Sequence, residues 1–159
     1  MNKYIIERDL ISLQKKRDEL LAELREIGKE IHDSLNQGSE TWHDNAPFEA
    51  LVAREKNAAK RIDELAQILE DVSLWEEEFN PEVITVGTRV VCDAGGDLRE
   101  YVVAGHWHDA DNYLPYKSVS AASPLGSQLI GKALGDEFVP ILPAGDPVPW
   151  IVISLFPVN

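Results

Sequence analysis

Residues 5–37 place apolar side chains at alternating steps of four and three, which aligns them along one stripe of a helix. The stripe consists of Ile6, Leu10, Leu13, Arg17, Leu20, Leu24, Ile27, Ile31 and Leu35. Arg17 interrupts its apolar character and Gly28 lies beside it, so each weakens the helix locally. A helix over residues 5–35 would be roughly 45 Å long at about 1.5 Å per residue. Because one such helix cannot bury its stripe alone, the pattern predicts a partner helix.

A second stripe supplies that partner. It repeats the same steps at Leu51, Glu55, Ala58, Ile62, Leu65, Leu69 and Val72. Asp44 to Pro47 combine a capping residue with a proline in the first turn, which signals a helix start. The expected facing pairs are Leu20 with Leu65, Leu24 with Ile62, and Ile27 with Ala58. The pattern predicts an antiparallel hairpin closed by Asn80 and Pro81, and two helices of a compact bundle are the alternative.

From Val83 onward, short β-branched runs divided by glycine and proline are typical of strands and turns. The expected strands are Val83–Val86, Thr88–Cys92, Glu100–Ala104, Lys117–Ala121, Glu137–Leu142 and Trp150–Phe156. Ser123 should cap a short helix with Pro124 at its first position, and this helix should continue over residues 127–134. The second half is therefore predicted to be a small α+β domain.

Residues 38–49 form the predicted turn and combine turn formers with carboxylates, a tryptophan and a histidine. In a hairpin this segment is an exposed tip, far from any core. Core packing does not explain an exposed Trp42 beside Asp44 and Glu40, so we interpret the tip as the functional end. The structural alternatives are a helix-start role for Asp44 and packing of Trp42 near Phe48.

The composition limits the classes of partner. The 28 acidic and 15 basic residues give a net charge of −13, which argues against a broad basic face for nucleic acid. The same charge favours a partner with a positive channel or surface. Cys92 is the single cysteine, so no internal disulfide can form and a reducing compartment is expected. No apolar run reaches membrane-spanning length, so we expect a cytoplasmic protein that does not bind membranes.

Residues 106–109, His-Trp-His-Asp, contain potential metal ligands. His106 and His108 would share one face of an extended segment. Zinc normally takes three or four protein ligands, and no cysteine or further histidine lies nearby in the sequence. A metal site here is therefore not the favoured interpretation.

Residues 123–138, Ser-Pro-Leu-Gly-Ser-Gln-Leu-Ile-Gly-Lys-Ala-Leu-Gly-Asp-Glu-Phe, resemble the signature of the Gre transcription elongation factors. In that family a Ser-Pro-Leu/Ile turn leads into a helix, a Gly-Lys step and a Gly-Asp. Residues 143–145 resemble its Pro-Gly-Gly turn, and residues 102–111 resemble its Ile-Val-Gly…Glu-Ala-Asp stretch. Residues 44–46 and 61–62 match its Glu-Asn-Ala and Arg-Ile at the same separation. The resemblance covers nearly the whole chain.

The resemblance implies an α+β fold, with an N-terminal antiparallel coiled-coil hairpin followed by an FKBP-like antiparallel β domain. We expect the hairpin over residues 1–79, with its tip at 38–49, and the globular domain over residues 80–159. The resemblance implies a monomeric accessory factor, not itself an enzyme, that binds bacterial RNA polymerase at the secondary channel. There it would stimulate cleavage of backtracked transcripts at the nascent RNA 3′ end. The implied polymerase-docking residues are Ser123, Pro124, Leu125 and Gly126.

The resemblance also implies that the tip carboxylate of Asp44 acts inside the polymerase active site, and we expect Glu40, whose side chain is one methylene longer, to reach the same place from one position before the family's first acid. Asp44 would share a Mg²⁺ ion of the polymerase, and the factor would need no cofactor of its own. Two metals suit phosphodiester hydrolysis because they clamp the attacking and leaving oxygens, and one or two protein carboxylates typically hold Mg²⁺. The further residues expected to contact RNA or the tip are Trp42, His43, Asn45, Arg54 and Lys56.

The tip departs from the family pattern, in which two acids stand three positions apart. Asp44 occupies the second acidic position, Thr41 occupies the first, and Glu40 precedes it by one residue. The basic residue that the family carries early in the second helix falls on Val52. These departures leave a second hypothesis open, a Gre-like regulator or inhibitor that occupies the channel without stimulating cleavage.

A third hypothesis is a peptidyl-prolyl isomerase, which an FKBP-like domain suggests but fold alone does not support. That activity needs a pocket lined by aromatic side chains. The candidates for such a lining are Tyr101, Trp107, Tyr113, Tyr116 and Trp150.

Overall fold

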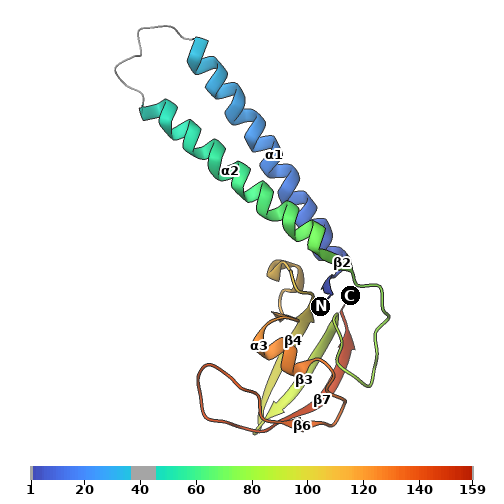
Figure 1. Ribbon diagram of the computed structural model, residues 1–159. Helices are drawn as coiled ribbons and strands as arrows, with labels where there is room; N and C mark the ends of the chain where they lie inside the picture. The colour runs from blue at the N-terminus through green and yellow to red at the C-terminus, as the bar shows by residue number, and fades with distance from the viewer. Residues whose placement is uncertain (1, 37–45, 159) are drawn as a thin grey trace. The chain divides into compact units, whose positions relative to one another are not determined.

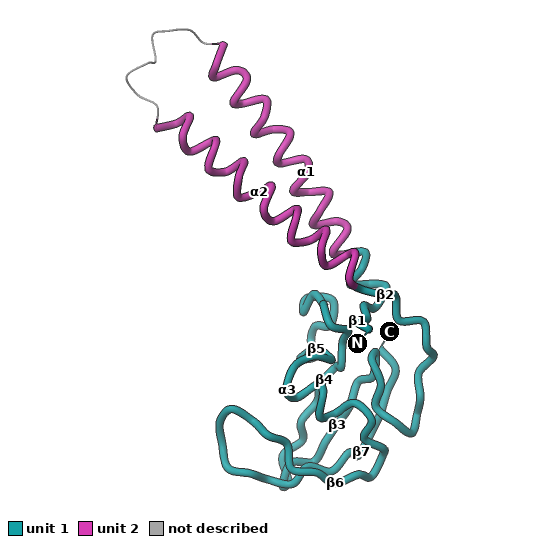
Figure 2. Tube along the Cα trace, in the orientation of Figure 1, with its two compact units in different colours: residues 1–11, 72–159 teal, residues 12–71 magenta. Residues whose placement is uncertain are grey.

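The computed structural model describes residues 2–36 and 46–158, which fall into two compact units (Figure 2). The helical unit spans residues 12–71, and the sheet unit combines residues 1–11 with residues 72–159. This division differs from the predicted boundary at residues 79 and 80, because the first residues of the chain pair with those that follow the second helix. The predicted domains, residues 1–79 and 80–159, stay a prediction.

Two antiparallel helices form the helical unit: α2 (Ala46–Asp71) and all of α1 (Glu7–Asn36) from residue 12 onward (Figure 1). Ile27 and Ala58, one of the expected facing pairs, are both buried. Of the other stripe residues between them and the base of the hairpin, Leu13 is also buried and the rest are half-buried, because a two-helix hairpin offers each stripe only one partner. The predicted antiparallel hairpin is confirmed. Neither helix is long and apolar enough to cross a membrane, nor is any other helix of the described chain.

Both helices are shorter at the base than the sequence pattern predicted. Residues Lys3–Ile5 form strand β1, which pairs in parallel with strand β2 (Val72–Leu74). The Trp75 N–H continues this ladder by donating to the Ile5 carbonyl at 2.8 Å. The prediction that the helical part continues to Asn80 is therefore wrong, because backbone pairing with a distant segment replaces the helical hydrogen bonds.

The sheet unit contains a five-stranded sheet in the order β5-β4-β3-β7-β6. Its strands are β3 (Thr88–Ala94), β4 (Asp97–Ala104), β5 (Lys117–Ser120), β6 (Glu137–Phe138) and β7 (Trp150–Pro157). A short 3₁₀ helix, η2 (Ala110–Tyr113), lies in the long connection between β4 and β5. This crossover makes β4 and β5 parallel, whereas the other pairs are antiparallel. The α+β class is confirmed, and the sheet is mixed instead of wholly antiparallel.

The short helix α3 (Pro124–Leu129) begins as predicted and ends earlier. The predicted continuation to Leu134 is wrong because the next residues bond to another segment. The Gly131 N–H donates to the Ile84 carbonyl, and the Ile84 N–H donates to the Lys132 carbonyl, both at 2.9 Å. The partner segment, expected as a strand over Val83–Val86, forms only an isolated bridge between Val83 and Ala133.

Strand β6 ends at Phe138, so the predicted strand over Glu137–Leu142 is too long. Pro140 has no N–H and cannot continue the ladder that β6 makes with β7. Further prolines stand at positions 143, 147 and 149, and residues 139–149 form neither strand nor helix (Figure 1).

The core of the sheet unit lies between α3 and the sheet. Its buried members are Ile84, Val90, Cys92, Val103, Leu129, Trp150 and Val152. Cys92 is fully buried, and this burial raises the pKa of its thiol to about 11. The thiol is therefore neutral near pH 7, and the reactive thiolate form is scarce.

A buried carboxylate fixes the first turn of α1 within the sheet unit. Asp9 is fully buried, and its Oδ1 accepts hydrogen bonds from the Asp109 N–H and the Asn112 Nδ2, both at 3.0 Å. The Tyr113 hydroxyl donates to Asp9 Oδ2. Burial, followed by this hydrogen bond, raises the pKa of Tyr113 well above its usual range. Three donors thus stabilise a carboxylate that would otherwise be costly to bury.

We expect Tyr113→Phe to lower the free energy of unfolding by about 1–3 kcal/mol, because it removes one donor from the buried Asp9 carboxylate. Urea denaturation measures the change, and Tyr116→Phe is the matched control, since Tyr116 is exposed. The folded-state pKa of Tyr113 is raised, so its contribution is complete below the unfolded value of about 10 and is lost as the pH rises further. The stability gap between wild type and Tyr113→Phe should therefore narrow above that pH, and a widening gap would contradict this assignment.

Candidate functional site

The predicted tip residues Glu40, Trp42, His43, Asp44 and Asn45 lie outside the described residues. The flanking elements are described: α1 ends at Asn36, and α2 begins at Ala46. The site can therefore be built only from the helices that carry the tip and from the sheet unit.

Arg54 and Lys56 lie in the first half of α2. Arg54 forms an ion pair with Glu30 of α1, with 3.7 Å between Nη1 and Oε2. Both side chains are about half exposed, so the pair contributes little to stability. Lys56 is exposed. Their proposed contact with RNA stays a prediction.

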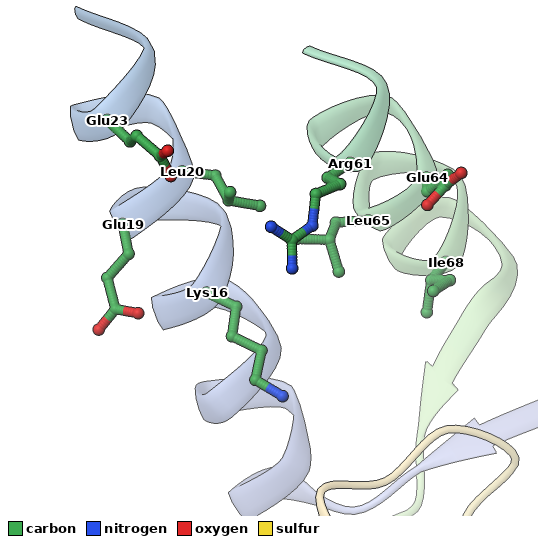
Figure 3. Close-up of a pocket in the computed structure, with 8 residues that line it drawn as sticks. All are labelled: Lys16, Glu19, Leu20, Glu23, Arg61, Glu64, Leu65 and Ile68. Atoms are coloured by element: carbon green, nitrogen blue, oxygen red, sulfur yellow. The ribbon is translucent and has the colours of Figure 1, made fainter. Parts of the chain in front are cut away.

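A groove of ≈390 Å³ lies between the helices, farther toward the base of the hairpin. Figure 3 shows the side chains of Leu20 and Leu65 pointing into the space between α1 and α2, as the facing pattern predicted. Arg61, one of the family-like positions, reaches into the same space from α2. The charged residues that line the groove are Lys16, Glu19, Glu23, Arg61 and Glu64. Their charges nearly cancel, so the groove offers no strong preference for a charged ligand.

The Ser123 turn at the start of α3 has the geometry that the sequence predicted. Ser123 Oγ accepts a hydrogen bond from the Gly126 N–H at 3.0 Å and donates to the Ser120 carbonyl at 2.7 Å. Pro124 occupies the first turn of the helix and is exposed. Leu125 packs against the core of the sheet unit.

Position 126 requires a glycine because the neighbouring backbone lies too close for a side chain. A Cβ atom at this position would lie well inside 3.0 Å of the Ser120 carbonyl oxygen. Of the four residues predicted to dock on the polymerase, Ser123, Leu125 and Gly126 therefore shape the turn, and Pro124 is the one presented to solvent. Their role in docking stays a prediction.

The histidines at 106 and 108 make structural contacts. The Tyr4 N–H donates to His106 Nδ1 at 2.9 Å, and the His106 N–H donates to the Tyr4 carbonyl at 2.7 Å. The His108 ring lies edge-on to Tyr113, with 6.1 Å between ring centroids. Within residues 2–36 and 46–158, no three histidine, cysteine or acidic side chains are grouped to hold a metal ion.

The aromatic residues proposed for an isomerase pocket do not line one cavity. Trp150 stacks on Tyr101 with 6.1 Å between ring centroids, and it borders a cavity of ≈230 Å³ under residues 139–148. Tyr113 and Tyr116 border a separate cavity of the same volume. This geometry gives the isomerase hypothesis no support.

Gln128 is a residue that the sequence-based reasoning missed. Its Oε1 accepts from the Ile141 N–H at 2.7 Å, and its Nε2 donates to the Ile141 carbonyl at 3.2 Å. The sequence signal that could have indicated such a contact is the four prolines of residues 139–149. A proline-rich segment must find hydrogen-bond partners for its backbone outside a strand ladder.

We expect Gly126→Ala to lower the free energy of unfolding of the sheet unit by about 1–3 kcal/mol, because the added methyl group overpacks the turn. Gly28→Ala is the matched control, since nothing lies within 4 Å of its Cβ position. In the interior of α1 this control should raise stability by about 0.5–1 kcal/mol. Urea titrations followed by circular dichroism measure both changes, and equal effects of the two variants would refute the steric explanation.

Comparison with known proteins finds relatives by sequence, and no protein-family model matches. The transcription elongation factor GreA of Thermotoga petrophila is 28% identical over 123 residues, which cover 76% of this chain and 75% of that protein. GreA of Ureaplasma parvum is 27% identical over 130 residues, covering 76% and 81%. Among solved structures, the GreA factor homolog Gfh1 of Thermus thermophilus has a TM-score of 0.45 at 22% identity, covering 98% and 99% of the two chains.

Proposed function

We propose that this chain is a Gre-family transcription elongation factor and that it acts on bacterial RNA polymerase. The curated GreA relatives, at a modest 27–28% identity, support the family. The sheet unit docks at the entrance of the secondary channel, and the helical unit carries the tip toward the active site. The tip then stimulates cleavage of the backtracked transcript at its 3′ end. The factor works as a monomer in the cytoplasm, and the polymerase performs the hydrolysis.

The observation that carries this proposal is the antiparallel pair α1 and α2. The 30 residues of α1 correspond to roughly 45 Å and the 26 residues of α2 to roughly 39 Å, at about 1.5 Å per residue. Ile27 and Ala58 are buried where the two stripes meet, so the helices support each other. In sequence, Asp44 stands two residues before α2 begins. Such a paired-helix arm can hold a carboxylate at a fixed distance from its base, which a flexible loop of the same length does not do.

The chemistry of the tip residues fits the proposed task. Asp44 and Glu40 offer carboxylate oxygens, which are the donors that Mg²⁺ prefers, and one or two such groups are typical of Mg²⁺ sites that act on phosphates. A Mg²⁺ ion of the polymerase would supply the Lewis acidity for hydrolysis. Asp44 would hold that ion and orient a water molecule, and Glu40, with its longer side chain, would assist from four positions earlier in the sequence.

A Gre-like regulator that occupies the channel without cleaving RNA is the second candidate. The observation that favours it is Thr41, which stands at the first acidic position of the family pattern. With a hydroxyl there, the tip has one carboxylate fewer in the family register, and Glu40 must compensate from the neighbouring position.

We expect the wild-type chain to accelerate transcript cleavage in a stalled, backtracked polymerase complex, and Asp44→Ala to reduce this acceleration about tenfold or more. A tenfold loss corresponds to about 1.4 kcal/mol of transition-state stabilisation, less than the several kcal/mol that a metal-assisted step can involve. Gel analysis of labelled RNA measures the rates. Glu49→Ala is the matched control because it removes an equal charge from the first turn of α2.

Binding of the chain to polymerase, measured in parallel, separates the two candidates. If wild type binds but leaves the backtracked RNA intact, the cleavage proposal is wrong and the channel-occupying regulator is supported. If Glu49→Ala loses as much activity as Asp44→Ala, the specific role of Asp44 is refuted.

A further inference from the structure

The segment between β6 and β7 is held in place by a side chain instead of a strand. Pro140 ends the ladder of β6, and Gln128 of α3 then pairs with the backbone of Ile141. An amide side chain that accepts from an N–H and donates to the carbonyl of the same residue reproduces the pairing that a neighbouring strand would make. The backbone at Ile141 is thus fixed although no strand reaches it.

The side chains on this fixed backbone are presented to solvent. Ile141 is 80% exposed, the most of any large apolar residue in the described ranges, 2–36 and 46–158. Val139 and Leu142, close to it in the chain, are also exposed, and we call these three residues the apolar ridge. Clustered exposed apolar residues on a backbone that is fixed by hydrogen bonds mark an interaction surface more often than an isolated exposed leucine does.

The ridge is continuous with the Ser123 turn. The Nε2 group of Gln128 that binds the Ile141 carbonyl also donates to the Pro124 carbonyl at 2.7 Å. One amide group therefore joins the ridge to the exposed proline of the turn, and the two present adjacent surfaces.

The charges around the ridge indicate the chemistry of its partner. Asp136, Glu137 and Asp146 are exposed carboxylates close to it in the chain. The nearest cation in sequence, Lys132, lies over the ring of Phe138 with Nζ 5.1 Å from the ring centroid. A complementary surface is therefore apolar at its centre and basic at its rim.

We propose that Ile141, flanked by Val139 and Leu142, is a second contact by which the sheet unit docks on RNA polymerase, and that Gln128 positions it. This inference rests on the proposed function, because the Ser123 turn supplies the partner. The ridge contacts an apolar patch with a basic rim on the polymerase surface, next to the patch that contacts Pro124.

The test measures the affinity of the full-length chain for core RNA polymerase by competition with a labelled wild-type chain. We expect Ile141→Asn to weaken binding about tenfold or more, since it removes an apolar side chain that the complex would bury. The backbone hydrogen bonds to Gln128 do not involve the Ile141 side chain, so folding should be preserved, and a thermal melt checks this.

Leu114→Asn is the matched control. Leu114 is 70% exposed and precedes β5, at the edge of the sheet opposite β6, so its loss should leave the affinity unchanged. Gln128→Ala should weaken binding in the same direction as Ile141→Asn, because it releases the backbone of the ridge while leaving Ile141 in place.

The outcomes separate this inference from the proposed function. Wild-type binding that Ile141→Asn leaves unchanged overturns the inference, and the polymerase role stands. An equal loss of polymerase affinity in Leu114→Asn also overturns the inference. The same holds if the wild-type chain forms a dimer, and Ile141→Asn dissociates that dimer without changing the affinity for polymerase. A wild-type chain that does not bind polymerase at all refutes the proposed function.

Discussion

The short parallel pairing of β1 with β2 is the constraint on which the rest of the structure depends. It joins the residues immediately before α1 to those immediately after α2, so the segment that forms the two helices begins and ends at neighbouring points. The buried Asp9 carboxylate reinforces this arrangement from the first turn of α1, through its bonds to the connection between β4 and β5. An antiparallel hairpin requires its two ends to lie together, and these contacts satisfy that requirement with backbone and side-chain hydrogen bonds.

The sequence predicted those elements whose signals are local. The alternating four-three spacing identified the hairpin, and Ser123 followed by Pro124 identified the start of α3. The errors fall where distant backbone segments compete for hydrogen bonds. Val72 fits the helical stripe but pairs with Lys3, and the end predicted for α3 failed because Ile84 binds the residues that follow it.

The candidate site was less accessible to sequence reasoning than the fold was. Roles for Asp44 and Glu40 could be inferred only from family resemblance, because the spacing of two carboxylates in a turn specifies no chemistry by itself. Gln128 and Asp9 gave no sequence signal of their own, since their importance arises from partners more than ten residues away in the chain. Pro140 was a visible signal for the end of β6, and its missing N–H outweighed the strand propensity of its neighbours.

The uneven burial along the helical stripe has a consequence for backbone amide exchange. Ile27 is fully buried, whereas Ile31 is only half-buried and Leu35 is 66% exposed. Few apolar contacts oppose local opening of the last turns of α1, so their amide protons should exchange with solvent by fraying, at a small free-energy cost. Amides near Ile27 require separation of the paired helices before they exchange. Along this part of α1, the opening free energy therefore decreases from Ile27 toward residue 36.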